Sequence, residues 1–253
     1  MDELYTKETK RSALIVTMTS SFLTPLALST VNVALPSIGQ EFSADAISLG
    51  WVAMAFILAA AMFLVPFGKL ADVYGRKKFF VYGMIIFTVA SFLLGTSKSI
   101  MMVILLRVPQ GIGGAMVFGT SVAILSSVFP AKERGSVLGL NVAAVYAGLS
   151  FGPFLGGLLT QQFGWRSVFF LNVPLGLFTI WFSIWKLRGE WAEGWSKPFD
   201  SIGSFIYCAM LLSLMYGFSL LPRVAGAFFV MLGICGIPVF VHWEGKVTNP
   251  VLD

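Results

Sequence analysis

The run ISLGWVAMAFILAAAMFLVPFG, residues 47–68, carries no charged side chain over its whole length. A helix needs about 20 consecutive, mainly apolar residues to cross a bilayer, and this run provides them. Its apolar residues are continuous, whereas a strand of a membrane barrel alternates apolar and polar residues. The stretch therefore predicts a transmembrane helix.

Seven further runs are also long and mainly apolar: residues 12–34, 79–97, 100–129, 137–160, 167–187, 201–221 and 225–243. In the whole chain, 57% of the residues are hydrophobic and 11% are charged, whereas a soluble domain has about 25% charged residues. A chain with so few charges cannot cover itself with a polar surface, so lipid must be its main solvent. We predict an all-α integral membrane protein with about eight transmembrane helices.

The basic residues are distributed unevenly among the connecting segments. With the N-terminus placed inside the cell, thirteen of the 17 Lys and Arg residues fall in inside segments, three fall outside, and Arg107 lies within a span. Because cytoplasmic loops are enriched in Lys and Arg, we predict a multi-pass protein of the cell membrane with both termini in the cytoplasm. The same bias accounts for the net charge of +5, so we expect lipid and no nucleic acid as a partner.

Cysteine and histidine are too scarce to build a metal site or a disulfide framework. The two cysteines, Cys208 and Cys235, lie within predicted spans, and the single histidine, His242, ends the last one. The spacing matches no metal-binding pattern, and the sequence offers no nucleophile–base set. We expect no metal, no cofactor and no enzymatic activity.

The longest internal connection is RGEWAEGWSKPF, residues 188–199, and it separates six predicted spans from two. We predict two parts on this basis. Residues 1–187 form a six-helix bundle, and residues 188–253 contain the connection, two further transmembrane helices and a short polar tail.

The loop after the second span reads GKLADVYGRKK, residues 68–78. A tight return of the chain is expected to use Gly68 and Gly75 for close approach and unusual backbone angles. Asp72 is a lone carboxylate among basic residues and can pair with Arg76 or with a helix N-terminus.

The fourth span contains RVPQGIGGA, residues 107–115, with Arg107 as its buried charge. An unpaired charge in lipid costs at least about 2.5–3.5 kcal/mol, so Arg107 is expected to face the bundle interior or a wet cavity. Gln110 lies one turn along on the same face. Small residues on this helix are expected to pack closely against a neighbour: Gly111, Ala115 and Gly119.

The fifth span contains GLSFGPFLGG, residues 148–157. Glycine recurs every fourth residue and predicts a smooth face against another helix, and the proline removes a backbone hydrogen bond and is expected to bend the helix. The residues of this motif are Gly148, Gly152, Pro153, Gly156 and Gly157.

These three motifs together resemble the major facilitator superfamily of membrane transporters. GKLADVYGRKK is similar to the family signature G-x-L-A-D-x-x-G-R-K, a loop that helps to lock the outward-facing state. RVPQGIGGA resembles the motif R-x-x-Q-G-x-G-x-A, associated with proton coupling, and GLSFGPFLGG resembles the antiporter motif G-x-x-x-G-P-x-x-G-G of proton-coupled exporters. The resemblance implies proton-coupling roles for Arg107 and Gln110, and gating roles for Gly68, Asp72, Gly75, Arg76 and Lys77.

Three shorter stretches resemble the fourteen-helix drug:proton antiporter branch of the family. They are VNVALP at 31–36, FGWRSVFFLNVPLG at 163–176, and the D-x-x-G that opens the seventh span at Asp200. Trp165 and Arg166 are expected at the outer interface, as an aromatic belt residue and an anchor. The branch has two extra helices between its halves, which implies an N-terminal six-helix bundle followed by two linker helices.

In bundles of this family the first, second, fourth and fifth helices face the substrate. The resemblance therefore implies a cavity whose polar or amphipathic lining includes Asn32, Gln110, Asn141 and Tyr146. An apolar, adaptable part of the pocket is expected to include Phe56, Met54 and Met62.

The sequence departs from the family in two ways. A second six-helix bundle does not follow, and the acid usual near the middle of the first helix is replaced by Ala27. Because alternating access needs both halves, we expect proton-driven export of small lipophilic compounds only with a C-terminal half-transporter or a second copy of the chain, which would carry the coupling acids. A non-transporting membrane fragment or assembly partner is the alternative, and import of a polar solute is a weaker one.

Overall fold

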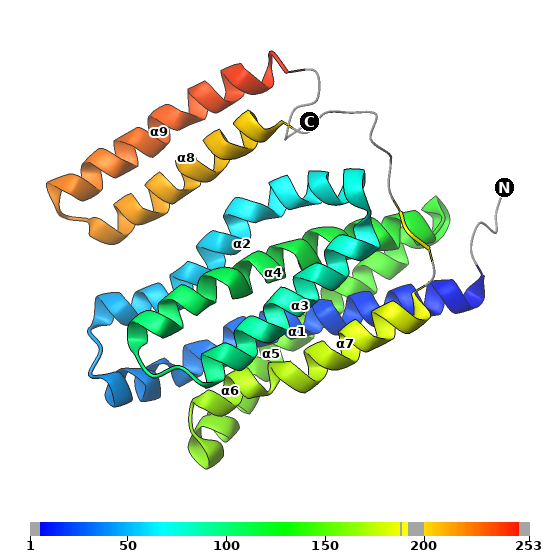
Figure 1. The fold of residues 1–253 in the computed structure, drawn as a ribbon, viewed down its shortest axis with the longest axis horizontal. Helices are drawn as coiled ribbons and strands as arrows, with labels where there is room; N and C mark the ends of the chain where they lie inside the picture. The colour runs from blue at the N-terminus through cyan, green and yellow to red at the C-terminus, as the bar shows by residue number, and fades with distance from the viewer. Residues whose placement is uncertain (1–5, 188, 192–199, 248–253) are drawn as a thin grey trace.

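The computed structural model describes residues 6–187, 189–191 and 200–247. The regular structure of these residues is entirely helical (Figure 1). The helices, in chain order, are α1 (Lys7–Phe42), α2 (Ala46–Tyr74), α3 (Arg76–Gly95), α4 (Ile100–Val128), α5 (Ala131–Phe163), α6 (Arg166–Phe170), α7 (Asn172–Lys186), α8 (Ser201–Leu220) and α9 (Val224–Glu244).

Eight helical segments of the described chain are long and apolar enough to cross a membrane, as predicted. The sixth of them is made of α6 and α7, which are separated only at Leu171. Several helices continue beyond the apolar runs that revealed them, and α1 extends from Lys7 to Phe42 where the sequence predicted 12–34. The polar ends were missed because they lack the apolar composition that marks a span.

Polar side chains cap several of the helix starts. Asp45 accepts a 3.0 Å hydrogen bond from the backbone N–H of Ser48, and Ser99 accepts one of 3.2 Å from Met102. Such caps satisfy the first amides of a helix, which lack acceptors within it. Hydrogen bonds from Ser48 also hold the pKa of the Asp45 carboxyl below its usual value.

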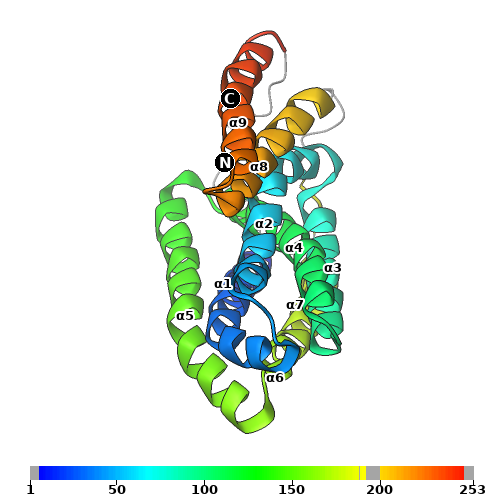
Figure 2. The ribbon, with the colours of Figure 1, turned by 90° about the vertical axis from the view of Figure 1, so that its left-hand side faces the viewer.

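The helices from α1 to α7 form one bundle (Figure 2). Helix α1 packs along α5, and α4 packs against both α2 and α3. Helix α7 returns beside α3 and α1. The end of this bundle that holds the α2–α3 turn, the start of α1 and the end of α7 is called the basic end below, because Lys10, Arg76 and Lys186 lie there.

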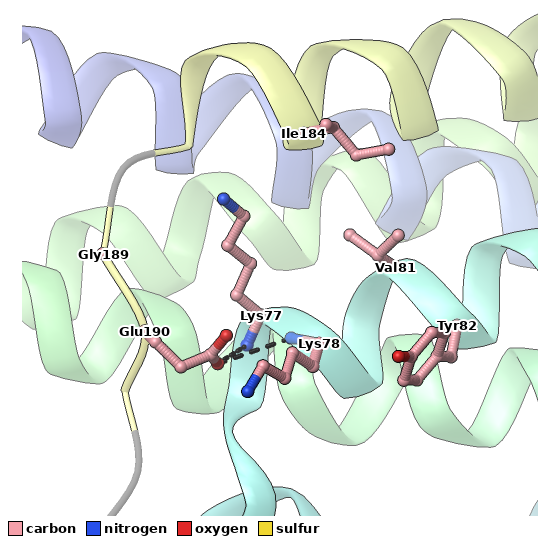
Figure 3. A pocket seen from close by; sticks show the side chains of 7 residues that line it. All are labelled: Lys77, Lys78, Val81, Tyr82, Ile184, Gly189 and Glu190. Carbon is pink, nitrogen blue, oxygen red and sulfur yellow. Dashed lines mark hydrogen bonds between the residues drawn. The ribbon is translucent and has the colours of Figure 1, made fainter.

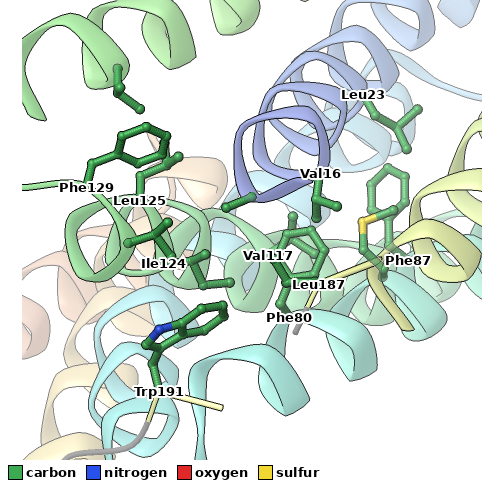
Figure 4. Packing of buried hydrophobic residues seen from close by; sticks show 14 of the residues in the cluster. Val16, Leu23, Phe80, Phe87, Val117, Ile124, Leu125, Phe129, Leu187 and Trp191 are labelled. Carbon is green, nitrogen blue, oxygen red and sulfur yellow. The ribbon is translucent and has the colours of Figure 1, made fainter. Parts of the chain in front are cut away.

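The apolar core of the bundle has two parts. One lies toward the basic end (Figure 4), and its fully buried members include Val16, Leu23, Phe80, Phe87, Ile124, Leu125 and Leu187. The other lies toward the opposite end and includes Val31, Ile38, Leu94, Val103 and Phe169. Ala27 has no exposed surface and belongs to the first part.

Helices α8 and α9 form a hairpin that lies beside α2 (Figures 1 and 2). The two helices approach closely where Gly217 faces the backbone of Gly226 and Val230. Two side chains of α8 donate hydrogen bonds to backbone carbonyls of α2: Tyr207 to Ala61 at 3.3 Å and Cys208 to Met62 at 3.2 Å.

Candidate functional site

Arg107 lies in the interior of the bundle, as predicted, and none of its surface is exposed. Its Nε donates a 2.8 Å hydrogen bond to the carbonyl oxygen of Val52 on α2. Its Nη1 donates a 2.7 Å hydrogen bond to Oε1 of Gln110, one turn along α4. The guanidinium carbon also lies 4.4 Å from the ring centroid of Phe56, where the negative face of the ring attracts a cation.

Gln110 connects the arginine to a third helix. Its Nε2 donates a 2.9 Å hydrogen bond to Oγ of Ser91 on α3, and this hydroxyl donates a 2.7 Å hydrogen bond to the carbonyl of Phe87. Helices α2, α3 and α4 are therefore joined through one buried polar chain. The sequence predicted the arginine and the glutamine but missed Ser91, because only the fold brings α3 beside α4.

The charge of Arg107 has only neutral partners among the described residues. No carboxylate forms an ion pair with it there, and its Nη2 is buried without an acceptor. A buried cation with a free donor attracts an anion or a polar group that enters the site.

The four polar residues expected to line a cavity do not come together. Gln110 has no exposed surface and Asn141 has 4%, so both lie inside the packed bundle. Asn32 and Tyr146 are exposed on α1 and α5, with 64% of the tyrosine exposed. The sequence could not tell the buried residues from the exposed ones. A polar residue in a span avoids lipid in either of two places, an interface between helices or a face that another protein covers.

The apolar residues expected beside that cavity are also separated. Phe56 lies under the guanidinium of Arg107 and is buried. Met62 instead lies where α2 meets α8, since its carbonyl accepts the hydrogen bond from Cys208. The hairpin therefore lies against the backbone of α2 at Met62, and the expectation that its side chain lines a pocket stays a prediction.

The predicted loop at 68–78 is far shorter than expected. Helix α2 continues to Tyr74 and α3 begins at Arg76, so only Gly75 separates them. Its φ of 115° lies in the left-handed region that glycine adopts without strain. Gly68 is helical, so the unusual backbone angle expected there is wrong. A Cβ added there would meet no atom within 4 Å, and its gating role stays a prediction.

The charged residues of this turn make the contact that the sequence predicted. Arg76 Nε donates to Oδ1 of Asp72 at 2.7 Å, one helical turn away in the chain. The Nη1 of Arg76 also donates to the hydroxyl of Ser127 on α4, a contact that the sequence did not reveal. The turn between α2 and α3 is thus tied to α4, while the backbone N–H of Lys77 is bound by Glu190 of the connection after α7 (Figure 3).

The glycines of the fifth span pack against α1 as predicted. A Cβ at Gly148 would collide with the carbonyl oxygen of Phe22, and one at Gly156 would lie 2.9 Å from atoms of Thr30. Gly152 faces Ser29 in the same way. Gly157 differs, since a Cβ there would meet only Val33 at 3.9 Å.

Pro153 of the same motif lies inside α5, and the helix continues through it to Phe163. A proline in a helix leaves the carbonyl four residues earlier without its usual donor. That carbonyl belongs to Leu149, and Oγ of Ser29 on α1 donates to it at 3.0 Å. A neighbouring helix therefore satisfies the backbone group that the proline frees, as membrane helices require.

The end of the bundle opposite the basic end is closed by Glu41. Its carboxylate accepts hydrogen bonds from Trp165 Nε1 at 2.7 Å and from both terminal nitrogens of Arg166, at 2.7 and 2.6 Å. Trp165 is only 3% exposed and packs against Phe42 and Phe169. It is therefore a core residue, whereas the sequence predicted an aromatic belt residue at the outer interface.

Comparison with known proteins gives a family match over residues 17–238, to the model described as Major Facilitator Superfamily. The multidrug resistance protein Stp of Mycobacterium tuberculosis is 34% identical over 251 residues, which cover 97% of this chain and 47% of that protein. The tetracenomycin C resistance and export protein of Streptomyces glaucescens is 31% identical, over 88% of this chain and 42% of that protein. The chain therefore spans less than half the length of these relatives.

Solved structures with a similar fold include a transporter. It is the inward-facing, unoccupied form of a bacterial homologue of the human lysosomal transporter Spinster. The TM-score is 0.58 at 18% sequence identity, and the match covers 95% of this chain and 62% of that one. This likeness shows the all-helical transporter fold.

Proposed function

We propose that this chain, which belongs to the major facilitator superfamily, forms the N-terminal part of a proton-driven exporter of small lipophilic compounds. The family consists of transporters, so the chain is a multi-pass membrane protein and not an enzyme, as the sequence predicted. Export is supported by the names of the two relatives, one a multidrug resistance protein and the other a resistance and export protein.

The buried arginine is the observation that carries this proposal. A guanidinium without a counterion in the membrane interior is costly, and intramembrane charge usually marks a substrate or ion pathway. Arg107 binds α2 directly and is linked to α3 through Gln110, its acceptors are neutral, and it retains one free donor. In the proposed cycle, Arg107 and Gln110 respond to charge that enters the pathway, and the acids that bind the proton belong to another part of the transporter.

A C-terminal half is the proposed partner. Alternating access moves one half of such a transporter against the other, and this chain matches less than half of its relatives. The exposed polar residues Asn32 and Tyr146 are proposed to face that half, because an aqueous pathway between the halves explains their exposure better than lipid does. Ala27 is packed in the core, which supports coupling acids elsewhere. A second copy of the chain is the other way to complete the pathway.

The turn between α2 and α3 is the proposed gate, with Asp72, Gly75, Arg76 and Lys77 as its residues. The proposed topology places this basic end and both termini in the cytoplasm of a cell whose plasma membrane holds the protein. We also propose the division into a bundle part, residues 1–187, and a hairpin-containing part, residues 188–253; the contacts among α1–α7 and between α8 and α9 support it.

Efflux from everted membrane vesicles tests the proposal. This chain is co-expressed with the C-terminal six-helix half of the Stp protein, and uptake of ethidium into energised vesicles is followed by fluorescence. We expect uptake that an uncoupler abolishes and that Arg107→Ala lowers at least about tenfold, since removal of a positioned charge commonly has this effect. Val241→Ala changes an exposed residue of α9 and serves as the control. No uptake, with both halves folded in the membrane, would contradict the proposal.

A further inference from the structure

The short segment Gly189–Trp191, which follows α7, binds the start of α3. Oε1 of Glu190 accepts a 3.0 Å hydrogen bond from the backbone N–H of Lys77 and a 3.4 Å hydrogen bond from that of Lys78 (Figure 3). These first-turn amides have no acceptor within their own helix, and Gly75 provides no side chain to cap them. A residue 113 positions away in the chain therefore caps α3, and its negative charge suits a helix N-terminus.

Trp191 anchors this segment in the core of the bundle. Its side chain is 8% exposed and belongs to the cluster of Phe80, Ile124 and Leu125 (Figure 4). Its carbonyl oxygen accepts a 2.9 Å hydrogen bond from the backbone N–H of Arg76. Three consecutive amides at the start of α3 are thus held by two consecutive residues of the connection.

Gly75 is adapted to this contact as well as to the turn. A Cβ at this position would overlap the side chain of Glu190. The turn needs a glycine for its φ of 115°, and the absence of a side chain also leaves the space that the carboxylate occupies. The same carboxylate lines a cavity of about 380 Å³ between α3 and the end of α7, with Lys77, Lys78 and Ile184 on its other sides.

We propose that Glu190 and Trp191 are positioning residues of the gate, which hold the turn at Gly75 in its present conformation and couple it to the connection that leads to α8. This inference rests on the proposed gating role of the turn. Coupling between two elements is reciprocal, so any movement that withdraws the connection frees the first amides of α3, and any movement of the turn loosens Trp191.

Hydrogen exchange of this chain in lipid nanodiscs tests the contact without any need for transport. We expect Glu190→Ala to speed exchange of the Lys77 and Lys78 amides by about tenfold, because the bonds to a charged acceptor are lost. Glu190→Gln keeps an acceptor oxygen and should restore most of the protection. Glu133→Ala, which removes another exposed acid of the basic end paired with Lys10, should leave these amides unchanged. Equal exchange in the wild type and Glu190→Ala would overturn the proposal.

Efflux by the co-expressed halves tests the link to gating. We expect Glu190→Ala to lower the maximal rate of ethidium uptake two-fold or more while the apparent KM stays constant, and Glu190→Gln to recover the rate. Faster exchange with an unchanged rate would overturn the positioning role. Absence of uptake by the wild-type pair would overturn the proposed function and the gating role with it. The exchange experiment would still show whether Glu190 holds the amides of Lys77 and Lys78.

Discussion

Helices α1–α7 and the hairpin of α8 and α9 are held in place by different kinds of contact. Within the bundle, backbones approach at glycines, a buried polar chain joins α2, α3 and α4, and ion pairs join helices near both ends. The hairpin meets the bundle mainly at α2, through the side chains of Tyr207 and Cys208 and the ring pair Trp51–Tyr216.

The difference indicates that the stability of the bundle depends on particular side chains more than the attachment of the hairpin does. Lipid is as apolar as leucine, so helices associate in a membrane through close packing and hydrogen bonds and not through a hydrophobic driving force. The bundle uses both devices at many points, whereas the hairpin contacts α2 with few polar groups. We therefore expect substitutions to have graded effects, large in the bundle and small at the hairpin.

The largest effect is expected at the contact between α1 and α5. Gly148→Leu would drive a side chain into the backbone of Phe22, and overpacking of this kind costs about 3 kcal/mol. The matched control is Gly157→Leu, whose Cβ would meet only Val33 at 3.9 Å. The free energy of unfolding in detergent micelles should fall for the first variant and stay nearly constant for the second. Equal losses would mean that the glycine face has no special role in packing.

A smaller loss is expected when the buried polar chain is cut. Gln110→Leu removes the acceptor of Arg107 Nη1 and leaves a buried charged donor unsatisfied, which costs about 2 kcal/mol. Ser91→Ala removes only the neutral acceptor of Gln110 and should cost about 1 kcal/mol. The same unfolding measurement compares the two. A stability loss no larger for Gln110→Leu than for Ser91→Ala would show that the arginine does not depend on this partner.

The ion pair at the opposite end should contribute less. Oε1 of Glu41 lies 2.6 Å from Nη2 of Arg166, and the two side chains are 41% and 35% exposed, respectively. Exposed pairs are worth about 0.5 kcal/mol and are screened by salt. A double-mutant cycle with Glu41→Gln and Arg166→Gln should give a coupling of this size at low salt, and the coupling should shrink in 1 M salt. A coupling that salt leaves unchanged would mean that the pair is effectively buried.

The smallest effect is expected where the hairpin meets α2. Tyr207→Phe removes the hydrogen bond to Ala61, and such bonds between membrane helices average about 0.6 kcal/mol. Tyr216→Phe is the control, because in the described part of the chain its ring packs on Trp51 while no residue bonds its hydroxyl. Hydrogen exchange of the α8 amides should rise up to threefold in Tyr207→Phe alone. A rise in exchange that corresponds to a free-energy loss as large as that of the bundle variants would contradict the difference between the two regions.

The sequence was sufficient for features that depend on composition or on short spacing. Continuous apolar runs predicted the spans, and the one-turn spacing of Arg107 to Gln110 and of Asp72 to Arg76 predicted pairs that the structure contains. Helix geometry places residues three or four apart on one face, so these pairs need no knowledge of the fold.

Features that depend on the neighbour of a helix could not be predicted. The role of Glu190 requires the connection after α7 to lie beside the start of α3, and the hydrogen bond from Cys208 to the Met62 carbonyl requires the hairpin to lie beside α2. Trp165 was expected as an aromatic belt residue at the outer interface, where tryptophan is common, but a carboxylate from α1 accepts a hydrogen bond from its indole N–H and permits burial. In each case the deciding contact joins segments far apart in the chain.

Proton movement driven by a substrate gradient tests the central claim most directly. Liposomes that contain the co-expressed halves are loaded with ethidium and a pH-sensitive dye, with the membrane potential clamped by potassium and valinomycin, and are then diluted into ethidium-free buffer. An antiporter exchanges outgoing substrate for incoming protons, so the account predicts acidification of the lumen that is absent from protein-free liposomes and strongly reduced in Arg107→Ala. Loss of ethidium through the protein without any change of luminal pH would contradict proton antiport.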